Sequence, residues 1–191
     1  MLISQAFAQT APAAAGGGAE STLMSLLPLV LMFVVLYFIM IRPQMKRQKE
    51  HKAMIDALAF WVKECDIDGF RCDMAHLVPL DFWFQARTRL DGVKPLFWLA
   101  ETEHPAYLSV FDSWYGWEWM AATEAYCRQH KNLFDLRAVL ERYEKDFPVG
   151  SMPLFFTSNH DENSWNGTEY EKYGDASKAL AVFSCTWSGI P

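Results

Sequence analysis

The stretch from Arg42 to His76 reads RPQMKRQKEHKAMIDALAFWVKECDIDGFRCDMAH, and it changes character along its length. It begins as a basic segment and ends as a short apolar strand pattern that carries Arg71 and Asp73. No Pro or Gly interrupts it from Met45 to Asp68, so one helix is predicted to cross the point of change. The apolar stripe of this helix recurs at helical spacing, at Met54, Leu58, Trp61, Val62 and Cys65.

Composition changes at the same point, which we place near Leu58. The chain of 191 residues is long enough for one domain, or for a small domain with an appendage. All eight Trp lie at or after Trp61. Before Ala59 there are five Lys or Arg and three acidic residues, whereas from Ala59 onward there are twelve Lys or Arg and twenty acidic residues. The two parts together give the net charge of −6. A change in both aromatic content and charge sign predicts a domain boundary.

The acidic, Trp-rich part argues against some classes of function. Its negative charge repels phosphate and no basic stripe runs among its aromatic residues, so no nucleic-acid partner is expected. The four cysteines are scattered without a C-x-x-C pair, so we expect no zinc site. They are expected to be free and mostly buried thiols, which suits a reducing compartment.

An uncharged apolar run of twenty residues, Thr22–Ile41 (TLMSLLPLVLMFVVLYFIMI), precedes the basic segment. At about 1.5 Å per residue, a helix of this length crosses the ~30 Å hydrocarbon core of a membrane. The alternatives are a buried helix of a soluble protein and a cleaved signal peptide. A signal peptide begins with basic residues and has its apolar run closer to the N-terminus than this chain does. Residues 1–21, rich in Ala and Gly, are predicted to be a disordered tail. Five basic residues follow the run and none precedes it, which predicts an outside N-terminus and a cytoplasmic remainder.

The Ala/Gly-rich lead, the apolar run and the segment YFIMIRPQMKRQKEHKAMIDAL, which ends at Leu58, resemble the YajC family over residues 1–58. The resemblance implies a single-pass accessory subunit in the bacterial inner membrane, with residues 42–58 as a basic cytoplasmic helix. It also implies the lipid bilayer and subunits of the Sec preprotein translocase as partners. Where this family continues into a small β-rich domain, the chain continues with different sequence from Ala59.

From Ala59 onward the pattern alternates between helix and strand, which is typical of parallel βα units. Strands are predicted at IDGFRCDM, PLFWLAE, VFDSWYG and MPLFFTSNHD, and helices at PLDFWFQARTRL, EWMAATEAYCRQH, LFDLRAVLERYEKDF and SKALAVFSCTWSG. Three of these strands end in an acid, at Asp73, Glu101 and Asp161. The carboxyl ends of barrel strands face one mouth, so these acids are expected to converge.

Converging carboxylates fit glycoside hydrolysis, in which a retaining enzyme holds its nucleophile and its proton donor roughly 5–5.5 Å apart. Apolar walls such as Phe97 and Trp98 are expected to keep the donor protonated. Taken one at a time, the acids are as typical of helix caps or salt bridges, and His160 is as typical of a structural histidine.

Together, DGFRCDMAH, FWLAETE and FTSNHDEN resemble three motifs of the α-amylase family, glycoside hydrolase family thirteen, within residues 59–191. The resemblance implies Asp73 as nucleophile, Glu101 as acid/base and Asp161 as the residue that stabilises the distorted sugar. It implies α-glucan as substrate, with no cofactor, and no metal because the family's calcium ligands fall largely on segments without a counterpart here. The substrate-binding residues that it implies are Arg71, which also keeps the nucleophile ionised, His76 and His160.

The predicted fold class is α/β, with a single N-terminal transmembrane helix followed by an incomplete (β/α)8 barrel. The barrel part, residues 59–191, corresponds to about strands four to seven. Strands one to three have no counterpart, and Ser188–Pro191 stands where strand eight would begin. A sheet with two open edges is expected to be prone to aggregation and to lack hydrolase activity on its own.

Three hypotheses follow from the two resemblances. The first is a YajC-like accessory subunit of the Sec translocase, fused to a truncated and inactive α-amylase-type fragment. The second is a membrane-tethered retaining α-glucan hydrolase whose barrel another chain completes. The third is an accidental joining of two gene pieces, in which each part keeps only residual properties of its family.

Overall fold

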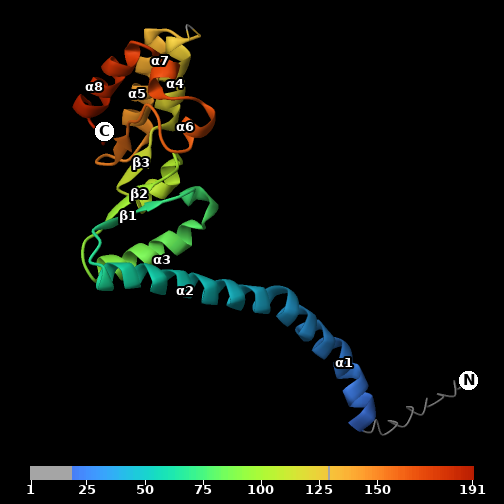
Figure 1. The fold of residues 1–191 in the computed structure, drawn as a ribbon. Coiled ribbons are helices and arrows are strands. Elements are labelled where there is room, and N and C mark those ends of the chain that lie inside the picture. Colours follow the sequence, from blue (N-terminus) through green and yellow to red (C-terminus); the bar gives the residue numbers. More distant parts are fainter. Residues whose placement is uncertain (1–18, 129) are drawn as a thin grey trace, which may run out of the picture. The chain divides into compact units, whose positions relative to one another are not determined.

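The structure is a computed structural model that describes residues 19–128 and 130–191 (Figure 1). It divides into two compact units, residues 1–53 and residues 54–191. The predicted disordered tail, residues 1–21, lies outside the described residues except for its last three, which begin the first helix.

The first unit is helical. Helix α1 (Ala19–Leu36) passes through a π-helical turn, η1 (Tyr37–Ile41), into α2 (Arg42–Glu64), which ends in the second unit. Large apolar side chains from Leu26 to Ile41 are exposed, and an eighteen-residue window of this helix has a mean hydropathy of 2.3 with none of it buried. By length and composition, the helix can therefore cross a membrane.

The second unit is built on a parallel four-stranded sheet in the order β1-β2-β3-β4. Its strands are β1 (Gly69–Cys72), β2 (Phe97–Ala100), β3 (Ser113–Tyr115) and β4 (Met152–Leu154). Each lies inside a predicted strand and is shorter than it. Strands that follow one another in the chain are neighbours in the sheet, as expected for consecutive βα units.

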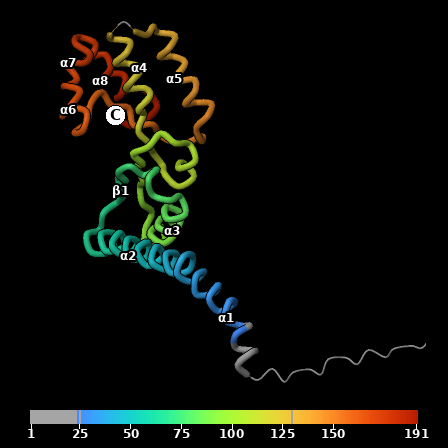
Figure 2. Tube along the Cα trace, turned by 90° about the vertical axis from the view of Figure 1, so that its right-hand side faces the viewer, coloured from blue at the N-terminus to red at the C-terminus, as the bar shows by residue number. Residues whose placement is uncertain are grey.

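Helices follow β1 and β3, as the alternating pattern predicts, whereas only a 3-10 turn lies between β2 and β3. The turn η2 (Ala75–Leu77) and helix α3 (Leu80–Asp91) follow β1, and the turn η3 (Pro105–Ser109) follows β2. The later helices are α4 (Trp117–Cys127), α5 (Leu133–Asp146), α6 (Glu162–Trp165), α7 (Glu169–Tyr173) and α8 (Ala176–Thr186). In both views of the chain, α3 lies toward the β1 side of the sheet and α4 to α8 gather toward β4 (Figures 1 and 2).

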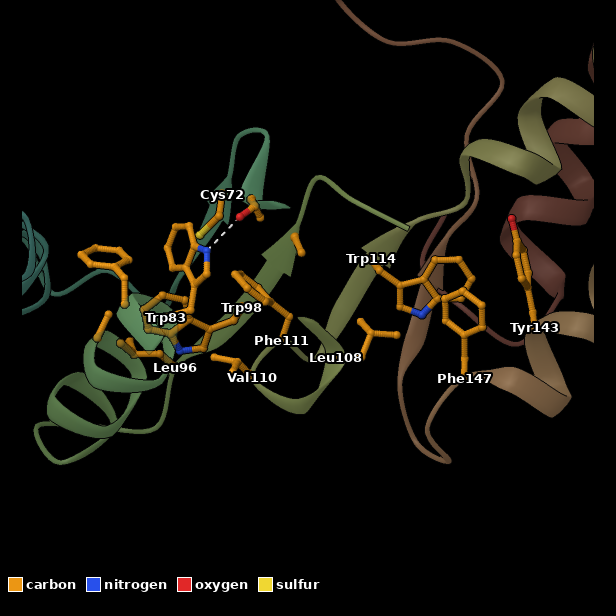
Figure 3. Close-up of a cluster of buried hydrophobic side chains, with 14 of the residues drawn as sticks. Cys72, Trp83, Leu96, Trp98, Leu108, Val110, Phe111, Trp114, Tyr143 and Phe147 are labelled. Carbon is orange, nitrogen blue, oxygen red and sulfur yellow. Dashed lines mark hydrogen bonds between the residues drawn. The ribbon is translucent and has the colours of Figure 1, made fainter. Parts of the chain in front are cut away.

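Aromatic rings fill the core of the second unit (Figure 3). Trp98 and Trp83 pack edge to face on Phe111, and Trp114 stacks on Phe147 at 4.1 Å between ring centroids. The Trp83 indole also donates a hydrogen bond of 3.0 Å to the carbonyl of Ala75. Packing therefore explains four of the eight Trp, at positions 83, 98, 114 and 119, whereas Trp61, Trp165 and Trp187 are exposed.

The part of α2 in this unit is buried along a stripe different from the predicted one. The buried residues are Ile55, Ala59 and Val62, whereas Trp61 is 51% exposed. Both stripes have helical spacing, so sequence periodicity alone does not choose between them. Close packing decides which stripe is buried, because helix α3 places the fully buried Ala86 and Leu90 in the same core.

The four cysteines are free, as predicted, but their burial differs from the expectation. Cys72 is buried and Cys127 is intermediate, whereas Cys65 and Cys185 are exposed. Burial raises the pKa of the Cys72 thiol to about 12, which leaves it protonated and unreactive at neutral pH.

The sheet does not close within the described part of the chain. Beyond β4, Ile190 adds one parallel bridge to Leu154, with backbone hydrogen bonds of 2.8 Å to Pro153 and Phe155. Among residues 19–128 and 130–191, no strand pairs with the outer edge of β1. The arrangement is an arc of four strands whose carboxyl ends all point the same way.

Candidate active site

The carboxyl ends of β1 and β2 bring two of the three predicted acids together. Asp73 directly follows β1, and Glu101 directly follows β2. The register pairs Cys72 with Ala100, and the amide of Glu101 donates to the carbonyl of Cys72 at 2.9 Å. The two carboxylates therefore start from adjacent positions at the same edge of the sheet.

Arg71 joins the two carboxylates. Its Nη1 contacts Asp73 Oδ1, and its Nη2 lies 3.1 Å from Glu101 Oε2. Its Nε donates to the hydroxyl of Tyr115 at 3.3 Å, and its guanidinium lies 5.5 Å from the centre of the Tyr115 ring. One guanidinium therefore fixes side chains from three consecutive strands.

Asp73 is held as an anion although it is exposed. The hydrogen bond from Arg71 is the main cause that lowers the pKa of Asp73, and a hydrogen bond with Glu101 and the charges of Arg71 and His160 lower it further. The side chain keeps 71% of its surface exposed. An ionised, accessible carboxylate fits the predicted nucleophile, although its exposure means that water is not excluded from it.

Glu101 is buried, with only 6% of its side chain exposed. Its Oε2 accepts a hydrogen bond of 2.9 Å from the amide of Met74, whose φ of 40° lies in the left-handed region. A positive φ is unfavourable for Met, so the turn after Asp73 is held in place by its surroundings. Sequence analysis expected apolar walls around this carboxyl group, whereas the structure gives it two donors, the Met74 amide and Arg71.

Asp161 and His160 lie on the segment that leads into α6, and both side chains are exposed. Their Oδ2 and Nε2 atoms are 3.4 Å apart. The Asn159 side chain accepts hydrogen bonds from the amides of Asp161 and Glu162 at 3.1 and 2.7 Å, which shapes the turn. Within the described part of the chain, no hydrogen bond or ion pair joins Asp161 to Asp73 or Glu101. Asp161 does not end a strand as predicted, because β4 ends at Leu154, and its convergence with the other two acids stays a prediction.

His76 lies in the turn η2, with an exposed side chain. Its carbonyl oxygen accepts a hydrogen bond of 3.0 Å from the hydroxyl of Tyr107, which also donates to the carbonyl of Val78 at 3.0 Å. The main chain of His76 is therefore fixed, whereas its imidazole makes no hydrogen bond or ion pair with the described residues.

Two further carboxylates, the half-buried Glu103 and the buried Glu162, were not singled out from the sequence. Glu103 accepts hydrogen bonds from the amide of Glu118 at 3.0 Å and from the hydroxyl of Tyr143, and burial raises the pKa of Glu103. Glu162 pairs with the buried Lys172 at 3.5 Å. Both lie inside quoted motifs, Glu103 in FWLAETE and Glu162 in FTSNHDEN, but their partners lie on other elements and could not be identified from the sequence.

No group of three or more His, Cys, Asp or Glu side chains is arranged to hold a metal ion in the described part of the chain. The chemistry available at this edge of the sheet is that of carboxylates and one guanidinium.

Residues 26–60 match the model of the YajC family, described as a preprotein translocase subunit. One relative is the Sec translocon accessory complex subunit YajC of Helicobacter pylori, 48% identical over 42 residues, which are 22% of this chain and 33% of that protein.

The remainder of the chain is similar to different proteins. The alpha-amylase MalA of Haloarcula japonica is 31% identical over 144 residues, which are 72% of this chain and 21% of that protein. The crystal structure of an alpha-amylase from Lactobacillus plantarum is 28% identical with a TM-score of 0.63, over 75% of this chain and 37% of that one.

These similarities confirm both predicted resemblances and the predicted fold class. The chain joins a YajC-like segment to an α/β region that matches part of the (β/α)8 barrel of α-amylases. The chain spans only about a third or less of the length of these two relatives, and 37% of the length of the solved structure.

Proposed function

We propose that this chain is a single-pass membrane protein with a YajC-type anchor that carries part of an α-amylase-type barrel on the cytoplasmic side. The observation that carries the proposal is the overlap of the matched residues 26–60 with a helix whose large apolar side chains from Leu26 to Ile41 are exposed. Five basic residues follow the apolar run, which favours a bacterial inner membrane orientation with the N-terminus outside.

The partner that this anchor favours is the Sec translocase, because its relatives are translocon accessory subunits. The test is co-purification of the full chain, solubilised in mild detergent, with the translocase channel. An unrelated single-span protein at the same expression level is the control. Enrichment of the channel over that control supports the proposal, and equal recovery contradicts it.

The α-amylase-type part has no hydrolase activity on its own under this proposal. Asp73 is 71% exposed, and the described sheet is open. Catalysis depends on a preorganised geometry of the reacting groups. Incubation of the full chain with starch is expected to release no more reducing sugar than the Asp73→Asn variant does.

A second candidate function is a membrane-tethered retaining α-glucan hydrolase that needs another chain to complete its barrel. It is favoured by the Arg71 bridge, which holds Asp73 and Glu101 close together at one edge of the sheet, as a pair of catalytic carboxylates must be. Starch hydrolysis that is lost in both Asp73→Asn and Glu101→Gln would establish this function and overturn the inactive one.

The third hypothesis, an accidental joining of two gene pieces, concerns origin. It is favoured by the change of relatives near Leu58, inside one helix. Sequencing the genomic locus across the codons for Ala57 to Phe60 tests it. A continuous native reading frame would contradict a joining during assembly.

A further inference from the structure

A concave surface lies on the first unit just past the apolar run. It is a shallow, open depression between side chains of one helix, lined by Phe38, Arg42, Pro43, Met45, Lys46 and Lys49, which we call the basic groove. Three of these six side chains carry a positive charge, and no acid lines the groove. Its position at the end of the run rests on the proposed function, in which that run crosses the membrane.

The π-helical turn arranges the apolar floor of the groove. The amide of Arg42 donates to the carbonyl of Tyr37, five residues back, so the backbone is wider here than in an α-helix. The Arg42 guanidinium lies 5.6 Å from the centre of the Phe38 ring, and Tyr37 packs edge to face on that ring at 5.4 Å. The groove therefore joins an aromatic surface directly to a cation.

The basic residues of the groove share one face of α2. Arg42, Lys46 and Lys49 follow one another at spacings of four and three, which places successive side chains above one another on a helix. The side chain of Lys46 is 78% exposed and pairs with Glu50 at 3.7 Å, an exposed ion pair that contributes little to stability. Arg47 lies five positions from Arg42, on a different face of the helix, and does not line the groove.

We propose that the basic groove binds the headgroup of an anionic phospholipid. The phosphodiester accepts hydrogen bonds from Arg42, Lys46 and Lys49, and the upper part of an acyl chain packs on Phe38 and Met45. Charge complementarity favours a lipid with net negative charge, because a choline group would add a cation beside three others. The uncharged run ends at Ile41, so the groove lies at the level of the lipid phosphates.

The test uses the full chain in vesicles of three parts phosphatidylcholine to one part phosphatidylglycerol. Spin-labelled versions of each lipid report the fraction immobilised by the protein. The wild-type chain is expected to prefer phosphatidylglycerol several-fold. Each cation near an anionic surface contributes about fivefold to such binding, so Arg42→Gln is expected to lower the preference by up to about that factor. Arg47→Gln, which removes the same charge outside the groove, is expected to change it less than twofold.

Resistance of the vesicle-bound chain to alkaline carbonate separates this inference from the proposed function. A chain that resists extraction but shows no lipid preference overturns the basic groove and leaves the membrane span intact. A chain that carbonate removes overturns both. Equal losses in Arg42→Gln and Arg47→Gln would show a diffuse charge effect and would also overturn the groove.

Discussion

At the scale of single residues, Arg71 decides the properties of the candidate site. It contacts Asp73, Glu101 and Tyr115, which come from three strands. Hydrogen bonds to Tyr115 and Asp73 outweigh the effect of partial burial and raise the pKa of Arg71, so the bridge stays charged at any accessible pH. The geometry needs Arg, because Lys cannot offer three donors in a fixed plane.

Replacement of Arg71 is expected to release Asp73. In Arg71→Gln, the pKa of Asp73 should rise toward the ordinary value of about 3.9, because its main hydrogen bond is lost. Because the pKa of Asp73 is lower in the folded chain, its ionisation stabilises the fold at pH values above the ordinary pKa. This stabilisation is lost as the pH falls through the pKa that Asp73 has in the folded chain. Carboxyl-carbon NMR during a pH titration measures the change. Arg137→Gln, which breaks an exposed pair with Glu141, should leave Asp73 unaffected.

Glu103 is expected to show the opposite pH dependence. The pKa of Glu103 is raised in the folded chain. Its contribution to stability is therefore complete at pH values below its pKa in the unfolded chain, about 4.3, and is lost as the pH rises through its pKa in the folded chain. Glu103→Gln keeps an acceptor for Glu118 and removes the charge, so its stability relative to wild type should increase from pH 4 to pH 7. Urea unfolding followed by Trp fluorescence measures this. The exposed Glu144→Gln is the control, and a parallel change there would contradict the assignment.

At the scale of elements, helix ends and strand contacts follow different rules. Helix α5 caps itself through the reciprocal hydrogen bonds of Asn132 and Asp135, which a sequence pattern can predict. Helix α4 follows Gly116, which has no capping side chain, and Glu103 from the segment after β2 supplies the acceptor instead. The cap of α4 thus fastens the exit of the Glu101 strand to the next βα unit.

The contact between β1 and β2 allows no side chain at Gly69. A Cβ there would lie 2.1 Å from the carbonyl oxygen of Phe97, which is backbone and cannot move alone. Gly69→Ala is expected to destabilise the second unit by about 3 kcal/mol, at the upper end of overpacking costs. Gly92→Ala, whose Cβ would meet its nearest atom at 3.4 Å with an ordinary helical φ, should cost less than about 1 kcal/mol. Similar urea midpoints for the two variants would contradict this account of β1 and β2.

At the scale of the whole molecule, the question is whether the open sheet of the second unit stays folded. Its core is largely aromatic and includes the fully buried Trp98 and Trp114, which favours a stable centre. Its parallel strands leave one edge without a partner strand among the described residues, which favours association with other chains.

Thiol reactivity tests the fold of the second unit without any change to its core. Cys65 and Cys185 are expected to react with an aromatic disulfide reagent within seconds to minutes, because both are exposed. Cys72 is expected to react only on unfolding, because burial raises the pKa of its thiol to about 12. A Cys65→Ser/Cys185→Ser double variant should lose the fast phase. Fast reaction of Cys72 in native buffer would show that the four-stranded sheet is not formed.

The sequence by itself determined the parts that depend on local pattern. Twenty uncharged residues predict the apolar helix, strand–helix alternation predicts parallel strands in chain order, and an acid at a strand end predicts the edge on which it lies. The YajC-like and α-amylase-like motifs were recognisable because each is a short continuous segment. The sequence did not determine which face of α2 is buried, since stripes through Trp61 and through Ala59 both have helical spacing. Only packing shows that Ala59 is buried and Trp61 is exposed.

Only the tertiary structure decided which side chains meet. Arg71 reaches Glu101 across thirty positions and Tyr115 across forty-four, and Glu103 reaches Tyr143 across forty. Such contacts depend on strand register and on the direction of each side chain, and a sequence pattern encodes neither. For the same reason only the structure shows that Arg71 joins Asp73 to Glu101, and that Asp161 lies beyond the end of β4 in a turn shaped by Asn159.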